Sequence, residues 1–328
     1  MKIKIIALAL AAVLLTGCGT SEAMNHTDNK ITQEETMDWT DIENVLPALV
    51  KNSLRIKTGG EAESPLSSRI GGNPMVPADF EWPYYEGETW DGIRENRPLS
   101  FLCQINLADA AEFDKDGLLP DCGMLSVFYE LASMKWGYDP EDRGCVRVFW
   151  FEDVSDLTER EAPDGTVDQN GEEVKIPVFP IVFSAEANLP SVTEYKAASG
   201  LDFRKVYDAR EAAAEKLELP PYEDPSGITK LLGYADLIQN DILSEAELVS
   251  RGYYLGDGEY REKMTDDEYA DAIAHRNDWV LLMQIGTVGG YPDFELMWGD
   301  MGCIYILIRK DNLAARNFDN VWLLLQCG

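Results

Sequence analysis

Short apolar runs constrain the fold of this chain more than any other feature. Each run has the length of a β-strand, and loops rich in glycine, proline or polar residues separate most of them. The runs expected to form strands are 99–107, 125–131, 146–151, 178–183, 280–285, 303–308 and 321–325. Helices are expected at about 42–49, 208–217, 244–252 and 265–276. Because the helices are fewer than the strands and do not alternate regularly with them, the sequence predicts an α+β, mostly antiparallel fold with short peripheral helices.

The chain also contains an internal repeat. When Gln104 is aligned with Gln284, each closes an apolar run and is followed by isoleucine. Gly123 then lies against Gly302 with a one-residue change of offset, and apolar runs of equal length follow both glycines. Apolar runs are common, so coincidence is the alternative explanation. The pattern predicts two related β-rich halves from an internal duplication, with a ligand groove between them.

The first eighteen residues have the form of a bacterial lipoprotein signal. Lys2 and Lys4 give a positive start, residues 5–15 are apolar, and small residues precede Cys18. Signal peptidase would cut before Cys18, whose thiol would carry a diacylglycerol. The alternatives are an ordinary signal peptide or a membrane span, but a span needs roughly 20 apolar residues. The sequence therefore predicts a protein anchored through Cys18 to the extracytoplasmic face of the cell membrane.

This signal divides the chain into three parts. Residues 1–17 are the expected signal peptide. Residues 18–37 are mostly Ser, Asn, Thr, Asp and Glu, so we expect a flexible tether. Residues 38–328 have enough apolar content to bury a core, and the expected halves are about 38–190 and 225–328.

Acidic residues far outnumber basic ones. The chain has 59 Asp and Glu against 28 Lys and Arg, a formal net charge of −31. A field of that sign repels nucleic acid and suits a cationic partner, although solubility alone would explain it. Neither a GxGxxG nor a GxxxxGK[ST] motif occurs, so we expect no nucleotide and no other cofactor.

Histidine and cysteine usage excludes several kinds of site. His26 lies in the expected tether, and His275 lies near the end of a predicted helix, where we expect it to be exposed. Two histidines cannot form a His-cluster zinc site, no CxxC pair occurs, and we expect no bound metal. Five cysteines follow Cys18, so at least one thiol is unpaired, and the spacing identifies no disulfide. Cys103 and Cys303 are expected to be small buried hydrophobic residues.

Four residues are candidates for lining the groove between the halves: Gln104, Gln284, Trp298 and Asp300. The two glutamines are polar residues in apolar strands, and a buried amide needs hydrogen-bond partners. The simpler explanation is that each ties its strand to a neighbouring loop. Trp298 and Asp300 lie in a glycine-rich segment that allows close backbone approach, and Asp300 could instead begin a turn.

Aromatic residues crowd one loop-rich region of the sequence. They are Trp82, Tyr84, Tyr85 and Trp90, with Trp136 and Tyr138 further on. Aromatic faces beside carboxylates are typical of sugar-binding surfaces, whereas a satellite core beneath long loops is the alternative. Acid pairs such as Glu152 with Asp153, or Glu295 with Asp300, could serve a glycosidase with carboxyls about 5 to 10 Å apart. Among so many acids some pair would meet that distance by chance.

Several short motifs follow one another in a characteristic order. They are Gly71-Gly72-Asn73-Pro74, Trp82-Pro83, Gln104-Ile105-Asn106, Leu231-Leu232-Gly233-Tyr234, Asp278-Trp279 and Trp298-Gly299-Asp300-Met301-Gly302. Together they resemble the YwqG-like family of bacterial proteins, a family of unknown function, over about 65–327. The resemblance implies a β-rich fold with two related halves, and for some relatives a toxin-immunity role. This chain departs from the family at Thr229, where many relatives carry histidine, and in having a lipoprotein signal.

We therefore expect a lipid-anchored extracytoplasmic binding or interaction protein without catalytic activity. Its ligand would be a basic protein or an envelope glycan. One alternative is a carboxylate-dependent hydrolase acting on envelope glycan or peptide, with two close carboxyls in a groove, one of raised pKa. A second alternative is a toxin-immunity protein, which would bind one basic secreted protein tightly.

Overall fold

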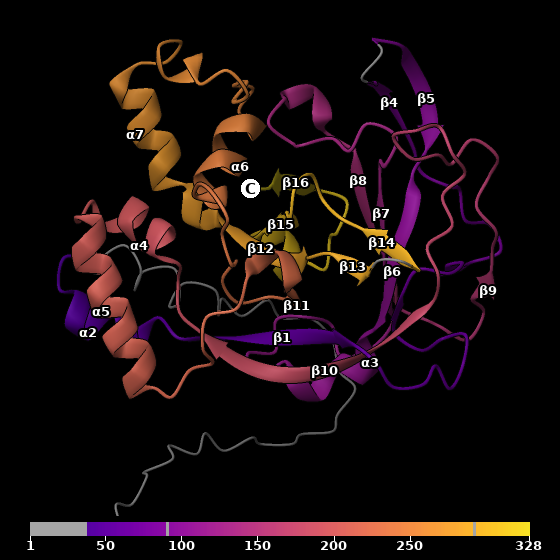
Figure 1. The fold of residues 1–328 in the computed structure, drawn as a ribbon, viewed down its shortest axis with the longest axis horizontal. Coiled ribbons are helices and arrows are strands. Elements are labelled where there is room, and N and C mark those ends of the chain that lie inside the picture. Colours follow the sequence, from indigo (N-terminus) through magenta and orange to yellow (C-terminus); the bar gives the residue numbers. More distant parts are fainter. Residues whose placement is uncertain (1–37, 90–91, 291–292) are drawn as a thin grey trace, which may run out of the picture. The chain divides into compact units, whose positions relative to one another are not determined.

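A ten-stranded sheet organises the computed structural model (Figure 1). Every pairing within it is antiparallel, which confirms the expected α+β fold with mostly antiparallel strands. The strand order is β16 (Val321–Gln326), β15 (Cys303–Arg309), β12 (Trp279–Ile285), β11 (Thr229–Leu231), β1 (Lys51–Thr58), β10 (Phe179–Asn188), β2 (Arg69–Ile70), β6 (Ser100–Asn106), β7 (Met124–Tyr129) and β8 (Val146–Phe151).

The structure describes residues 38–89, 92–290 and 293–328. Residues 39–328 belong to one structural unit, to which the following description refers. The predicted signal peptide 1–17, the lipidation site Cys18 and the tether 18–37 lie outside the described residues.

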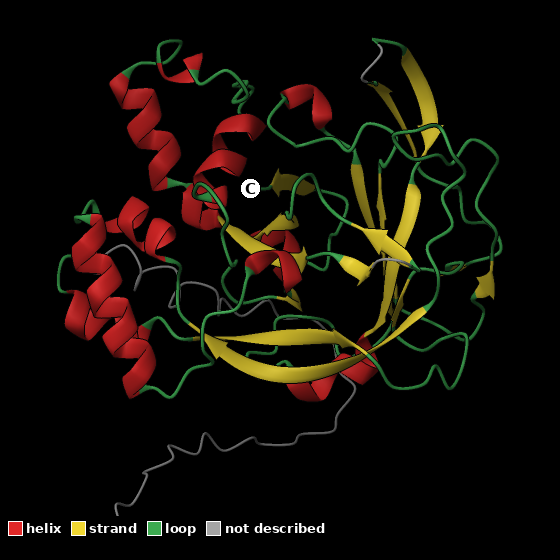
Figure 2. Cartoon of the chain, in the orientation of Figure 1, coloured by secondary structure: helices red, strands yellow, loops and turns green. Residues whose placement is uncertain are grey.

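Three two-stranded ladders and a set of short helices surround the large sheet (Figure 2). The ladders are β3 (Met75–Val76) with β9 (Thr158–Glu159), β4 (Tyr84–Glu88) with β5 (Arg94–Pro98), and β13 (Val288–Gly290) with β14 (Phe294–Leu296). The α-helices are α2 (Ile42–Ala48), α3 (Leu107–Ala110), α4 (Val192–Ser199), α5 (Phe203–Lys216), α6 (Ile242–Ser250), α7 (Asp266–Ala274) and α8 (Lys310–Ala314). The 3-10 helices are η1 (Ala111–Phe113), η2 (Pro140–Asp142), η3 (Pro225–Gly227), η4 (Glu259–Arg261) and η5 (Arg276–Asp278).

The order of the strands is symmetric about the centre of the sheet. From one end it runs β8, β7, β6, β2, and from the other β16, β15, β12, β11, with β10 and β1 adjacent in the middle. Figure 1 shows β1 and β10 side by side as two long strands. The terminal strands β8 and β16 also contact each other, so the sheet nearly closes on itself.

The main core fills one face of this sheet. In β1, Leu54 and Ile56 are buried in it, and Leu231 of β11 and Met283 of β12 continue the same layer. Arg55 lies between the two apolar residues and therefore projects from the opposite face, because successive strand residues point to opposite sides.

A separate buried layer covers the opposite face of the sheet in the half that contains β12, β15 and β16. Helix α6 packs Ala246 and Val249 against Trp279, Tyr305 and Trp322, and these side chains form a second buried cluster. In the other half, the rings of Phe80, Trp82, Phe128 and Phe149 pack with centroids 5.1 to 6.3 Å apart and are continuous with the main core. A third cluster joins α2, α4 and α5 and includes Leu46, Tyr195 and Val206.

Two predicted helix starts had different outcomes. Helix α7 begins with the predicted capping box, in which Thr265 and Glu268 bond each other's backbone. Helix α6 begins earlier than predicted, because Asp241 rather than Ser244 is its N-cap. The Asp241 carboxylate accepts a hydrogen bond from the Ser244 backbone and also pairs with buried Arg276 at 2.7 Å, so it joins the helix start to a tertiary contact.

Candidate functional site

A pocket of about 380 Å³ lies where the two ends of the sheet meet. Its residues come from the β4–β5 hairpin, from the segment between β7 and β8, and from the chain after α6. They are Tyr85, Gly87, Glu88, Thr89, Arg94, Ser133, Lys135, Trp136, Tyr138, Asp139, Glu141, Asp142 and Tyr254. The volume is in the range of sites that bind small molecules.

The hairpin supplies one wall of the pocket. Burial alternates along β4, so Tyr85 and Gly87 face inward and Glu88 is exposed. The Tyr85 ring lies against the backbone of Gly87, where a Cβ atom would come within 2.1 Å of the ring. Burial raises the pKa of Tyr85 well above its usual value, so its hydroxyl stays protonated and donates to the Glu141 carbonyl at 3.1 Å.

Arg94 joins the hairpin to the floor of the pocket. Its guanidinium donates to Glu86 on the neighbouring strand at 3.3 Å and to the Glu141 carboxylate at 3.2 Å. All three side chains are at least half exposed, so the two ion pairs orient the groups without contributing much to stability.

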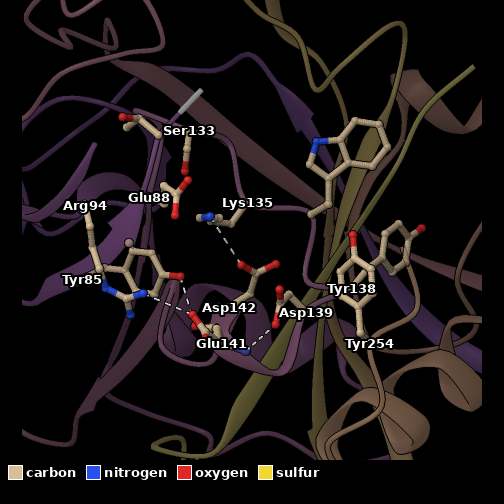
Figure 3. A pocket seen from close by; sticks show the side chains of 13 residues that line it. Tyr85, Glu88, Arg94, Ser133, Lys135, Tyr138, Asp139, Glu141, Asp142 and Tyr254 are labelled. Atoms are coloured by element: carbon tan, nitrogen blue, oxygen red, sulfur yellow. Dashed lines mark hydrogen bonds and ion pairs between the residues drawn. The ribbon is translucent and has the colours of Figure 1, made fainter. Parts of the chain in front are cut away.

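The floor is the short helix η2, which carries the buried acid of the site. Asp139 caps it by accepting from the Glu141 amide at 2.9 Å. The Asp142 carboxylate accepts from the Gly137 amide at 3.0 Å and lies 3.7 Å from the Lys135 ammonium. Burial raises the pKa of Asp142, and the Lys135 charge opposes that rise. Figure 3 shows Asp142 and Lys135 pointing toward one another in the middle of the site.

The segment that carries Trp136, Gly137 and Tyr138 is tied to the other half of the molecule. The Trp322 indole donates to the Gly137 carbonyl, and the Leu325 amide donates to the Trp136 carbonyl, both at 2.9 Å. Gly137 has φ +79°, and a Cβ there would lie 1.7 Å from the Leu323 carbonyl oxygen, so the two backbones approach too closely for any side chain.

A further backbone hydrogen bond brings the last wall into place. The Leu255 amide donates to the Tyr138 carbonyl at 2.9 Å. This bond holds Tyr254 opposite the hairpin, with Tyr138 beside it, as Figure 3 shows. Tyr254 is 44% exposed and therefore forms a rim of the pocket rather than part of its floor.

The chemistry of the lining favours a cationic or polyhydroxylated ligand. Four aromatic rings, Tyr85, Trp136, Tyr138 and Tyr254, share the pocket with four acids, Glu88, Asp139, Glu141 and Asp142, and with two bases, Arg94 and Lys135. Both bases already lie beside carboxylates of the pocket. Aromatic faces attract cations, and carboxylates both attract cations and accept hydrogen bonds from hydroxyls.

The predicted groove residues Gln104 and Gln284 lie elsewhere. They occupy β6 and β12, which four other strands separate in the sheet, and both are fully buried. The Gln104 amide donates to the carbonyls of Pro65 and Ser67, and its oxygen accepts from the Met75 amide at 3.1 Å. It therefore ties β6 to the loop at residues 65–67 and to β3, which is the structural role that the simpler explanation gives it.

Gln284 repeats this arrangement in the other half. Its amide donates to the carbonyls of Pro225 and Ile228, and its oxygen accepts from the Asp236 amide at 2.9 Å. Neither Gln284 nor Gln104 lines the pocket. A ligand groove between the two glutamines stays a prediction.

Trp298 and Asp300 are also outside the pocket. The Trp298 ring is fully buried, lies 5.8 Å from the Tyr129 ring, and donates to the Gly286 carbonyl at 2.8 Å. Asp300 is exposed, and its carbonyl accepts from the amide of Gly328 at 2.8 Å. The predicted acid pairs at 152–153 and 295–300 line neither described cavity.

The aromatic residues noted in the sequence divide between core and pocket. Trp82 is buried, and its indole donates to the Leu99 carbonyl at 2.9 Å. Tyr85, Trp136 and Tyr138 line the pocket. Of the two others, Tyr84 is exposed and Trp90 lies outside the described residues.

The acids and the lysine of the pocket were not predicted. Lys135, Asp139, Glu141 and Asp142 flank the aromatic pair 136–138 in the sequence, and this mixture of rings and charges was a signal that could have been read. Tyr254 had no such signal, because only the tertiary hydrogen bond of Leu255 brings it to the site.

Other reactive side chains are held in structural positions. His275 is exposed at the C-terminal cap of α7, as predicted, and its Nδ1 lies 2.8 Å from the Asp271 carbonyl. Cys103 and Cys303 are fully buried, also as predicted, and burial raises the pKa of each thiol to about 12.

The described parts of the chain contain no group of three or more His, Cys, Asp or Glu side chains placed to hold a metal ion. They also contain no helix with the length and apolar character of a membrane span.

Comparison with known proteins identifies a family but no function. No curated protein matches the chain. One family model, described as "Domain of unknown function (DUF1963)", matches residues 68–327. This range contains the whole large sheet except β1, and all thirteen pocket residues. The chain therefore belongs to the DUF1963 family, a family of unknown function.

Proposed function

We propose that this protein is a lipid-anchored extracytoplasmic binding protein, without catalytic activity, that holds a cationic group of its ligand in the 380 Å³ pocket. The observation that carries the proposal is the pocket lining, in which four aromatic rings and four carboxylates converge. A protonated amine on a glycan or on a basic protein suits both kinds of group. The formal net charge of −31 would also steer such a partner toward the protein.

The amine requirement can be tested with defined probes. We expect a tetramer of glucosamine, with free amines, to bind at least about tenfold tighter than its N-acetylated counterpart in calorimetric titrations. Tetralysine serves as the peptide probe. Preference for tetralysine would favour a basic protein partner and would support the toxin-immunity alternative. Equal binding of the free and acetylated glycans would contradict the amine requirement.

Matched variants test whether the ligand binds in the pocket. Tyr254→Ala with Glu88→Gln removes an aromatic rim and an exposed acid, and we expect affinity to fall about tenfold or more. Tyr207→Ala with Glu61→Gln removes the same residue types at exposed positions outside the pocket, and binding should not change. If both double variants bind as the wild type does, the pocket is not the binding site.

The membrane anchor is supported by the sequence signal at Lys2, Lys4, residues 5–15 and Cys18. Expression of the full chain with a radiolabelled fatty acid should label the wild type and leave Cys18→Ser unlabelled. Fractionation should place the wild type with membranes and release the variant. An unlabelled wild-type protein would overturn the lipoprotein assignment. The ordered motifs also support membership of the YwqG-like family, from which the lipoprotein signal is a departure.

A carboxylate-dependent hydrolase is a second candidate, favoured by Asp142. This acid has a raised pKa and shares the pocket with three other carboxylates, which is an arrangement suited to a general acid. Incubation with envelope glycan and peptide fragments separates the two functions. Turnover that Asp142→Asn abolishes, with probe binding retained, would establish the hydrolase, and retention without turnover would support the binding protein.

The two halves are further proposed to descend from one duplicated unit. The symmetric strand order supports this, since β2, β6, β7 and β8 correspond to β11, β12, β15 and β16. Strands β6 and β12 carry a bulge at equivalent positions, after Phe101 and after Leu281, 180 residues apart. Gln104 and Gln284 face a basic residue on the adjacent strand, Arg69 or Lys230. A superposition in which these strands fail to coincide would contradict the duplication.

A further inference from the structure

A second cavity, of about 320 Å³, differs from the pocket in its charge. Its polar lining consists of Arg55, Lys57 and the threonines Thr58, Thr229 and Thr287, and no acidic residue lines it. The chain as a whole has about twice as many acidic as basic residues, so a cavity with two bases and no acid is unusual for it. The two cavities share no residue.

The cavity exists because two neighbouring strands end at different points. Strand β1 pairs with β10 along the whole length of β1, to Thr58, but with β11 only as far as Ile56. Before Thr229 the chain forms the turn η3 instead of continuing the strand. Lys57 and Thr58 therefore have no partner strand on that side, and the space beside them is the cavity.

Arg55 is the buried cation of this cavity. Its side chain is 7% exposed, and its Nε has no hydrogen-bond partner. One terminal nitrogen pairs with the carboxylate of Glu223, whose side chain is 49% exposed. A buried donor without an acceptor is costly, so Nε would gain from an acceptor brought by a ligand.

A second buried cation adds to the positive field. Lys230 lies directly opposite Arg55 in the β1–β11 pairing, is 1% exposed, and pairs with Asp236 at 2.5 Å. Lys57, two residues after Arg55, lies on the same face of β1 and is exposed. Arg55 and Lys57 are the two like charges of the cavity on one face of β1, and an anion between them would relieve their repulsion.

We propose that this cavity binds the phosphate group of a small ligand. Arg55 would donate through its Nε, and Lys57, on the same face of β1, would supply a second charge. The volume exceeds that of phosphate alone, and buried Ile70 and Val288 give an apolar wall for an attached organic group. In the absence of ligand, the Glu223 carboxylate pairs with one terminal nitrogen of Arg55, so it would compete with the phosphate.

Calorimetric titration of the full-length protein in non-ionic detergent tests the proposal. The probes are glycerol 3-phosphate, glycerophosphoglycerol and acetate. The first represents a free phosphate monoester, the second the diester of an anionic lipid headgroup, and the third a planar carboxylate. We expect one phosphate compound to bind saturably and at least about tenfold tighter than acetate. Whether the monoester or the diester binds identifies the source of the phosphate.

Three variants make the test specific. Lys57→Ala removes an exposed cation and should weaken phosphate binding about tenfold, whereas Lys216→Ala, an exposed cation on α5, should leave it unchanged. Glu223→Gln removes the competing charge and should tighten binding several-fold. Absence of saturable phosphate binding, an equal affinity for acetate, or unchanged binding in both Lys57→Ala and Glu223→Gln would overturn the proposal.

Discussion

Gln104 and Gln284 show, at the scale of single residues, how this protein uses buried amides. Each is fully buried in a strand of the large sheet, and each satisfies both its carbonyl oxygen and its amide group on backbone groups outside that sheet or at its strand ends. A polar residue inside an apolar run is visible in a sequence, so both glutamines could be singled out. Their partners could not, because those partners lie 29 to 59 residues away along the chain.

Removing either amide should destabilise the protein. Gln104→Leu and Gln284→Leu leave buried backbone groups without partners, so we expect the free energy of unfolding to fall by about 1 to 3 kcal/mol in each. Urea titrations followed by tryptophan fluorescence measure the change. Gln169→Leu, at an exposed position, is the control and should stay within about 0.5 kcal/mol of the wild type. A glutamine variant as stable as this control would show that the amide is dispensable.

At the scale of elements, the bounds of strongly apolar strands were predicted well, whereas strands that mix polar with apolar residues were missed. Strand β8 has the predicted bounds, and β12, β15 and β16 differ from prediction by one residue at one end. Strand β1 was missed because polar residues interrupt Leu54 and Ile56, and Arg55 between them is buried by strands and a carboxylate that lie far away in the sequence. Short-range pattern cannot reveal burial that depends on a distant partner.

The segment between β7 and β8 should depend on one glycine. In Gly137→Ala a Cβ would lie 1.7 Å from the Leu323 carbonyl oxygen, so the backbones of the two halves must separate. Gly144→Ala is the matched control, because Gly144 also has positive φ but no atom lies within 4 Å of its Cβ position. We expect Gly137→Ala to lose at least about 2 kcal/mol more of unfolding free energy than the control does. Equal losses would mean that the close approach costs nothing.

Helix α6 carries an acid that should make stability depend on pH. Burial raises the pKa of Glu245 to about 7, whereas its ordinary value is 4.5. The folded protein therefore holds this proton between about pH 4.5 and 7 while the unfolded chain releases it, so stability should fall as pH rises through that window and then level off. Glu245 contributes on the order of 3 kcal/mol at most to this fall in the free energy of unfolding.

Thermal melts from pH 4.5 to 8 would measure this dependence. Glu245→Gln cannot ionise, so we expect a shallower decline, with the remainder due to buried Glu194, whose pKa is also raised to about 7. Glu61→Gln, at an exposed position, should keep the full decline. If Glu245→Gln declines as steeply as the wild type, this carboxyl does not hold its proton in the folded state.

At the scale of the whole molecule, fold class could be predicted and arrangement could not. Counting strands and helices sufficed for an antiparallel α+β fold. The pocket, by contrast, combines residues near 85–94, 133–142 and 254, which meet only because the sheet nearly closes. Of the predicted site residues, Gln104 and Gln284 followed the repeat and Trp298 and Asp300 a glycine-rich segment, and all four are buried structural residues or surface residues outside the pocket. The pocket lies in loops that differ between the halves, where a repeat carries no information.

The central position of β1 has a consequence for the order of folding. Ribosomes release residues 51–58 early, yet their partners in β10 and β11 are residues 181–188 and 229–231. Within the parts of the chain that the structure describes, no closer segment pairs with this strand, so it waits unpaired through the synthesis of more than a hundred residues. Loop closures of that length slow folding and leave an open edge exposed to other chains. A nascent chain that ends before residue 181 therefore cannot assemble the middle of its own sheet, which makes completion of the chain a precondition of its fold.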